Sequence, residues 1–152
     1  MPEAAIFQAR IGNANVAIPG AAVTPLPLQV VTYSSPLITH VLGSSEIEFQ
    51  ADGIFVAYWA TSINNTNANR SNSQTALFLD SGGGFFPIIG TTGYGYHRTT
   101  AQGRDTTVGF LRSQPVTRGD KIEVASQRIA GTGALQFIAA SCYVLLGFLP
   151  VG

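Results

Sequence analysis

The segment that decides the fold of this chain reads Gly53-Ile54-Phe55-Val56-Ala57-Tyr58-Trp59-Ala60. Alternate side chains of a β-strand point to opposite faces, so Phe55, Ala57 and Trp59 share one face. The other face carries Ile54, Val56, Tyr58 and Ala60. Because neither face is polar, we expect a strand that packs on a core on one side and on a partner on the other.

Further strands are predicted on both sides of this segment. Period-two patterns bounded by turn residues recur along the chain, and no convincing amphipathic helix interrupts them. The expected strands are residues 5–10, 28–33, 37–42, 46–50, 54–63, 75–80, 85–89, 106–112, 121–127 and 135–149. Their number and length predict an all-β sandwich of eight to ten strands.

The length of 152 residues suits one domain with one core. Within it we expect an amino-terminal arm and first strand over residues 1–27 and the main part of the domain over residues 28–152. Prolines are expected to divide the early part of the chain into short edge strands, at Pro19, Pro25, Pro27 and Pro36.

Charge is scarce in this chain. Charged residues make up 11% of it and hydrophobic residues 45%, whereas about 25% charged is typical. We therefore expect an obligate oligomer with much of its surface against protein, the alternative being a surface of uncharged Ser, Thr, Asn and Gln. The net charge of +0 argues against a nucleic-acid partner. Residues 1–97 nevertheless carry a net charge of −3 and residues 98–152 a net charge of +3. These opposite charges either pair, within a protomer or between subunits, or are scattered and solvated.

Membrane insertion and secretion are not expected. The apolar stretch 134–149 contains Gln136 and Ser141 and falls short of the roughly 20 residues of a membrane span. Cys142 is the only cysteine, so no disulfide forms within one chain. The start of the chain has no basic region followed by an apolar stretch, so we expect assembly in a cytoplasm rather than secretion through a signal peptide.

Four patterns follow one another along the chain. They are Phe7-Gln8-Ala9-Arg10, Phe49 with Gly53-Ile54-Phe55, Val116-Thr117-Arg118-Gly119-Asp120-Lys121-Ile122-Glu123-Val124 and Leu145-Leu146-Gly147-Phe148-Leu149. Their order resembles the globular heads of the complement and tumour necrosis factor superfamily. The resemblance covers residues 5–150 and implies an all-β jelly-roll sandwich of two antiparallel sheets that forms a homotrimer, with residues 28–152 as its jelly-roll trimerisation domain. This chain departs from the family pattern at Ala57, where family members usually have an aromatic residue, and has no Gly-x-y stalk.

The resemblance also implies roles for particular residues. Positions two and four after the glycine of the Gly53 strand enter the core in these families, and positions three and five meet at the three-fold axis. The implied trimer interface is Val56, Tyr58, Tyr143 and Leu145. The expected core includes Phe49, Phe55, Trp59 and Phe148.

Residues 91–103 mix tyrosine, glycine, histidine and arginine, as recognition loops do. The candidate recognition residues are Tyr94, Tyr96, His97 and Arg98, the alternative being that the tyrosines pack on their own domain.

Catalysis and cofactors have little support. A serine triad would have to combine His97 with Asp80 or Asp105, and no catalytic motif is present, so we expect no enzyme. Oxygen ligands for calcium are available at Asp52, Asp80 and Asp105, but nothing groups them, so we expect no metal and no cofactor.

Two function classes remain. The first is a phage capsid decoration (cement) protein, bound to a major capsid protein at the virion surface after assembly in the host cytoplasm. The second is a recognition head that binds a receptor or glycan at a fibre tip or on a bacterial or spore surface. A start at Met1 without a stalk favours the first.

Overall fold

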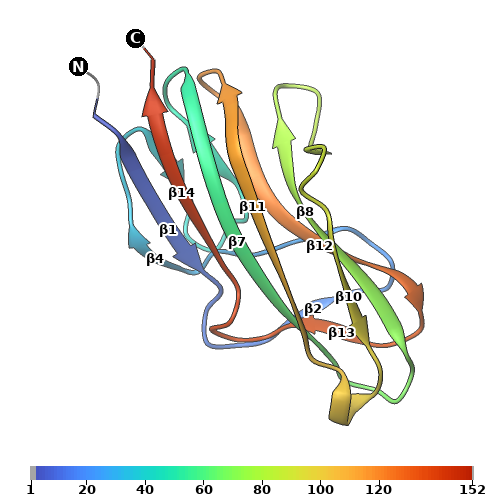
Figure 1. The fold of residues 1–152 in the computed structure, drawn as a ribbon. Helices are drawn as coiled ribbons and strands as arrows, with labels where there is room; N and C mark the ends of the chain where they lie inside the picture. Colours follow the sequence, from blue (N-terminus) through green and yellow to red (C-terminus); the bar gives the residue numbers. More distant parts are fainter. Residues whose placement is uncertain (1–2, 152) are drawn as a thin grey trace.

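The structure is a computed structural model that describes residues 3–151, apart from the side chains of Ala101 and Arg112. Two antiparallel β-sheets pack face to face (Figure 1). The first sheet has the order β2 (Val16–Ile18), β13 (Leu135–Phe137), β7 (Gly53–Asn65), β14 (Tyr143–Pro150), β1 (Ala5–Arg10) and β4 (Val30–Tyr33), with β11 (Asp105–Val116) on the other side of β7.

The second sheet covers the inner face of the first. Its order is β10 (Gly93–His97), β8 (Ser71–Asp80), β12 (Lys121–Gly131), β6 (Ile47–Phe49) and β5 (Ile38–His40), with β3 (Thr24–Pro25) on β12 and β9 (Phe86–Pro87) on β8. A short 3-10 turn, η1 (Thr100–Gln102), joins β10 to β11. The predicted all-β jelly roll of two antiparallel sheets is confirmed. No helix in residues 3–151 has the length and apolarity needed to cross a membrane.

Strand β7 organises the first sheet. It pairs with β14 along one edge and with β11 along the other, and Tyr58 faces Leu145 on β14 and Phe110 on β11. Phe55, Ala57 and Trp59 are buried, whereas the side chains between them are partly exposed. The two faces of the strand therefore alternate as its sequence predicts.

Close aromatic packing fills the sandwich between β6, β7 and β14. The Phe49 ring lies 5.1 Å from the rings of both Phe55 and Phe148, and these three side chains are buried together with Trp59. Gly109 on β11 makes room for this core, since a Cβ atom there would lie 2.1 Å from the Trp59 ring. Phe49, Phe55, Trp59 and Phe148 all lie in the core cluster.

The interior of the sandwich becomes more polar toward the η1 end. The hydroxyl groups of Thr61, Thr75 and Ser126 form a buried chain, with oxygen–oxygen distances of 3.0 Å and 2.6 Å. These residues come from β7, β8 and β12, so the chain links both sheets. Hydrogen bonds there take the place of the aromatic contacts found nearer the chain termini.

The stretch 135–149, predicted as one strand, is two strands. Phe137 of β13 lies opposite Ile63 and Tyr143 of β14 lies opposite Ala60, so residues 138–142 loop out between them. Ala140 in that loop has a φ of 57°, which a continuous strand does not allow. The same loop tucks the Cys142 thiol against the backbone amide of Ser62 at 3.3 Å.

Residues 3–27, expected to include an arm, belong to the sandwich. Strand β1 lies between β14 and β4, β2 pairs with β13, and β3 pairs with β12. Ile11, Ile18 and Leu26 are buried in the core. Short strands and the buried side chains near them hold much of this segment against the rest of the sandwich.

Candidate functional site

The outer face of the first sheet is apolar and open to solvent. Val56 is 41% exposed, Tyr58 37% and Leu145 38%, and Tyr143 is half-buried beside them. Other exposed apolar side chains on this face are Ile6, Ile54, Val108, Phe110 and Leu149. The residues expected at a trimer interface thus lie together on this surface, which we call the apolar face.

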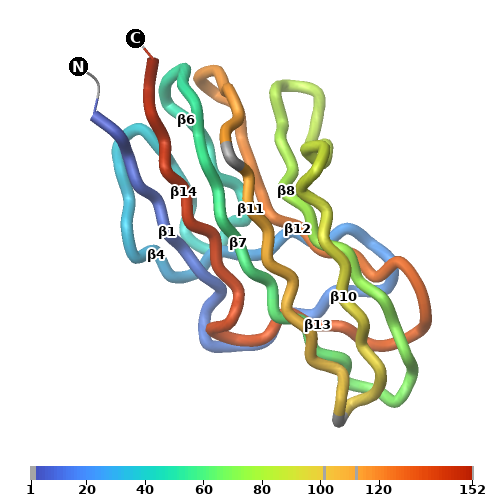
Figure 2. Tube along the Cα trace, in the orientation of Figure 1, coloured from blue at the N-terminus to red at the C-terminus, as the bar shows by residue number. Residues whose placement is uncertain are grey.

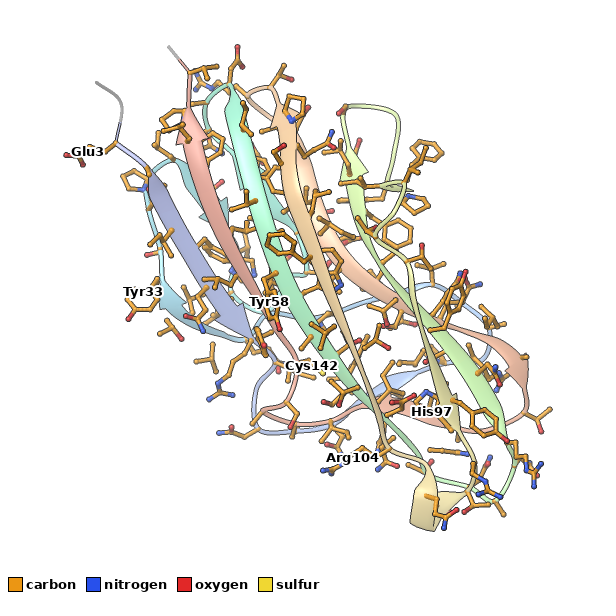
Figure 3. All side chains as sticks on the ribbon, in the orientation of Figure 1. Glu3, Tyr33, Tyr58, His97, Arg104 and Cys142 are labelled. Carbon is orange, nitrogen blue, oxygen red and sulfur yellow. The ribbon has the colours of Figure 1, made fainter. Side chains whose placement is uncertain are left out.

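A shallow groove runs through the middle of the apolar face. It has a volume of about 260 Å³ and is lined by Ile6, Val56, Ala57, Tyr58, Phe110, Leu145, Leu146 and Gly147. Strands β1, β7, β11 and β14 all contribute to it, and Figure 3 shows Tyr58 near the middle of β7. A groove with this lining offers dispersion contacts and almost no hydrogen bonds, as the centre of a protein–protein contact does.

Three aromatic rings form the centre of this face. Tyr58 stacks on Tyr143, with ring centroids 6.1 Å apart, and lies at an angle to Phe110, 6.5 Å away. Burial raises the pKa of the Tyr143 hydroxyl, and the neighbouring Tyr58 raises it further. Tyr143 therefore stays neutral at pH 7 and adds no charge to the apolar face.

The expected recognition residues separate into exposed and buried ones. Tyr94 and Tyr96 are 68% and 45% exposed on the outer face of the second sheet, and Arg98 is exposed directly after them. His97 is buried, so the expectation that it belongs to an exposed loop is wrong. Residues 93–97 form strand β10, whose alternation turns Gly95 and His97 inward.

His97 holds the end of the second sheet in place. Its Nδ1 atom lies 2.7 Å from the carbonyl oxygen of Gly103, and its Nε2 atom lies 2.8 Å from the hydroxyl of Ser73. The neutral form with the proton on Nδ1 satisfies both contacts, since that nitrogen donates to the carbonyl and the other accepts from the hydroxyl. His97 thereby ties β8 and β10 to the segment after η1.

No serine triad forms from the residues considered for one. Ser73 and His97 are in contact but are both buried, and the second nitrogen of His97 faces a carbonyl rather than a carboxylate. Asp105 accepts hydrogen bonds from the backbone amides of Tyr96 and Thr106. Asp80 accepts hydrogen bonds from the amides of the glycine turn 82–84. These carboxylates shape turns and strand ends.

The carboxylates considered as calcium ligands are dispersed. Asp52 accepts a hydrogen bond from the backbone amide of Arg118 at 2.8 Å, whereas Asp80 and Asp105 accept theirs from the amides of Gly82 and Tyr96. Within residues 3–151, no three His, Cys, Asp or Glu side chains are grouped closely enough to hold one metal ion.

Sequence reasoning missed three residues that lie on the apolar face or beside the exposed tyrosines of the second sheet. Ile6 and Phe110 belong to the apolar face, and Asn72 lies opposite Tyr96 on the second sheet. The sequence could have placed Phe110 on this face, because Val108 and Phe110 alternate with Gly109 and so share one side of their strand. It could not have placed Asn72, since only the pairing of β8 with β10 brings it beside the tyrosine.

The fold matches solved structures, although the sequence does not match known families. No protein-family model matches the chain, and no match is found among curated proteins. Murine APRIL, solved at pH 5.0, is similar with a TM-score of 0.65 and 9% identity, over 97% of this chain and 100% of that one. Eiger TNF from S. frugiperda is similar with a TM-score of 0.62 and 11% identity, over 100% of this chain and 96% of that one. The chain therefore has the tumour necrosis factor-like jelly-roll fold, as its sequence patterns predict.

Proposed function

We propose that this chain is a non-enzymatic head that assembles into a homotrimer through the apolar face. The observation that carries the proposal is the run of exposed apolar side chains across β1, β14, β7 and β11, centred on Tyr58. Monomeric proteins rarely leave such a contiguous patch uncovered. The likeness in fold to murine APRIL and Eiger TNF supports a head of this kind rather than an enzyme.

The mass of the assembly tests this proposal. Light scattering coupled to size exclusion is expected to give three times the chain mass of 16.0 kDa. A monodisperse monomer or dimer at micromolar concentration would contradict it.

Within this class, we propose a recognition head. Tyr94, Tyr96 and Arg98 lie on the outer face of the second sheet, on the opposite side of the sandwich from the apolar face. A trimer built through the apolar face leaves them open to solvent. Exposed tyrosines beside polar side chains are typical of binding surfaces, because they offer large contact areas at low conformational cost.

Capsid decoration is the second candidate, with a major capsid protein as partner and the virion surface as location. The observation that favours it is an apolar tip near β9, where Ile89 is 98% exposed and Phe86 is also exposed. Such side chains suit a contact with protein better than one with a glycan.

Sedimentation of the purified protein with expanded, undecorated phage shells tests the decoration role. Binding should also raise the melting temperature of the shells by mass action. Failure to co-sediment with the shells, together with binding to a cell envelope, would reject this candidate.

A further inference from the structure

Charge is segregated along the length of the sandwich. Among the described side chains, the end where both termini lie carries Glu3, Glu46, Glu48, Asp52, Asp80, Asp120 and Glu123, against Arg118 and Lys121. The η1 end carries Arg70, Arg98, Arg104 and Arg128, against Asp105. Figure 3 shows Glu3 and Arg104 at these opposite ends.

Two of these arginines, Arg70 and Arg98, are available for a ligand, whereas Arg128 is half-buried and donates a hydrogen bond to the carbonyl oxygen of Gly133. Among the described residues, the one ion pair is that of Lys121 with Glu46, at 3.1 Å near the opposite end. Arg70 and Arg98 are exposed. The nearby Asp105 carboxylate is satisfied by the backbone amides of Tyr96 and Thr106.

The pairing of β8 with β10 aligns these arginines with the exposed tyrosines. Tyr94 lies opposite Gln74 and Tyr96 opposite Asn72. The last pair of this ladder is His97 with Ser71. Arg98 comes two residues after Tyr96 and Arg70 two residues before Asn72, so alternation places both arginines on the same outer face as Tyr96 and Asn72. We call these six side chains the tyrosine–arginine face.

We propose that the tyrosine–arginine face binds an acidic oligosaccharide, carboxylated or sulfated; this inference rests on the proposed recognition head. Guanidinium groups form paired hydrogen bonds with carboxylate and with sulfate-like anions. The exposed ring faces of Tyr94 and Tyr96 are negative and attract the polarised C–H groups of a sugar ring. The Asn72 amide, opposite Tyr96 on β8, offers two donors and an acceptor for sugar hydroxyls.

Other polyanions fit this surface less well. Nucleic-acid binding depends on many phosphate contacts and a broad positive field, whereas here the excess of arginine is confined to one end of a chain with net charge +0. An acidic peptide would use the arginines but not two flat rings set beside an amide. The combination of rings, amide and arginines favours a sugar that bears acid groups.

Calorimetric titration of the whole protein tests the inference. The probes are a sulfated dextran hexasaccharide, an oligogalacturonate hexasaccharide and neutral maltohexaose. We expect one or both acidic sugars to bind and the neutral sugar to bind at least about tenfold more weakly, because the charged hydrogen bonds are lost. Which acidic sugar binds identifies the acid group.

Two pairs of variants localise the binding. The double variant Arg70→Gln/Arg98→Gln is expected to weaken acidic-sugar binding at least about tenfold, while Arg118→Gln at the opposite end leaves it unchanged. Tyr96→Ala is expected to weaken binding, while Phe86→Ala on β9 does not. All of these side chains are exposed, so the fold is retained.

Three outcomes would overturn the inference. They are a trimer that binds neither acidic sugar, binding of poly-glutamate or single-stranded oligothymidylate as tightly as the sugars, and sugar binding that survives the double arginine variant. Light scattering on the same samples separates this failure from the failure of the proposed trimeric head, which a monomeric mass would reveal.

Discussion

Replacing Tyr58 with aspartate tests the proposed trimer at its centre. Tyr58 packs between Phe110 and Tyr143 in the middle of the apolar face, and its remaining exposed surface is the part that a neighbouring protomer would cover. In a closed trimer Tyr58→Asp would place three carboxyl groups in a contact lined by apolar side chains, among them Val56, Phe110 and Leu145. The protomer itself should still fold, because its core residues are untouched.

The size of the effect follows from the cost of keeping these carboxyl groups neutral. Aspartate has an ordinary pKa of about 3.9, and one pKa unit corresponds to about 1.36 kcal/mol. A carboxyl group held neutral at pH 7 in a dry interface costs up to about 4 kcal/mol, or up to about 12 kcal/mol for three copies. At about 1.4 kcal/mol per factor of ten, the trimer dissociation constant rises by up to about nine orders of magnitude.

Light scattering at pH 7 and at pH 4 measures this effect. Tyr58→Asp should be a folded monomer at pH 7 and should regain trimer toward pH 4, where its carboxyl groups accept protons. Tyr94→Asp is the matched control, since the same substitution on the outer face of the second sheet should leave the trimer intact. A Tyr58→Asp protein that stays trimeric at pH 7 with unchanged melting would refute the assignment of the apolar face.

Three further predictions concern the folded protomer. Gly109→Ala should lower the free energy of unfolding by about 3 kcal/mol in chemical denaturation, because its Cβ atom would meet the Trp59 ring; unchanged stability would mean that the ring can move aside. Burial raises the pKa of Glu123 above 4.5, so ionising this carboxyl group costs more free energy in the folded protein than in the unfolded chain. The free energy of unfolding therefore falls as the pH rises above 4.5. Glu123→Gln should then be the more stable protein at pH 7 and lose this advantage below pH 4.5, and a pH-independent difference in melting temperature would contradict the cause. Deleting residues 1–10 removes β1 from between β14 and β4 and should abolish cooperative unfolding by circular dichroism, whereas a free arm could be removed without loss.

The two faces of β7 could be predicted from sequence because local physics decides them. Apolar residues occupy every position from Ile54 to Ala60, so alternation alone divides them between two surfaces. The break between β13 and β14 could not be predicted, because the loop 138–142 contains no glycine or proline. Its turn depends on Ala140 in a conformation that alanine rarely adopts.

The burial of His97 was hidden for a different reason. Gly93 and Gly95 made the segment look like a loop, and only its pairing with β8 makes it a strand. The same pairing sets Tyr96 beside Asn72. Contacts between distant segments thus decided the part of the candidate site that the sequence left open.

The buried hydroxyl chain of Thr61, Thr75 and Ser126 marks a boundary between two parts of the sandwich that should differ in local stability. Near the termini, aromatic contacts make the strands separate only when the whole protein unfolds, so amide hydrogens of β7 there should exchange slowest. Around the hydroxyl chain, water can replace each lost hydrogen bond, so β10 and the start of β8 should open locally and exchange faster. The tyrosine–arginine face lies in this part of lower local stability. A bound ligand would slow hydrogen exchange there without any change in average structure.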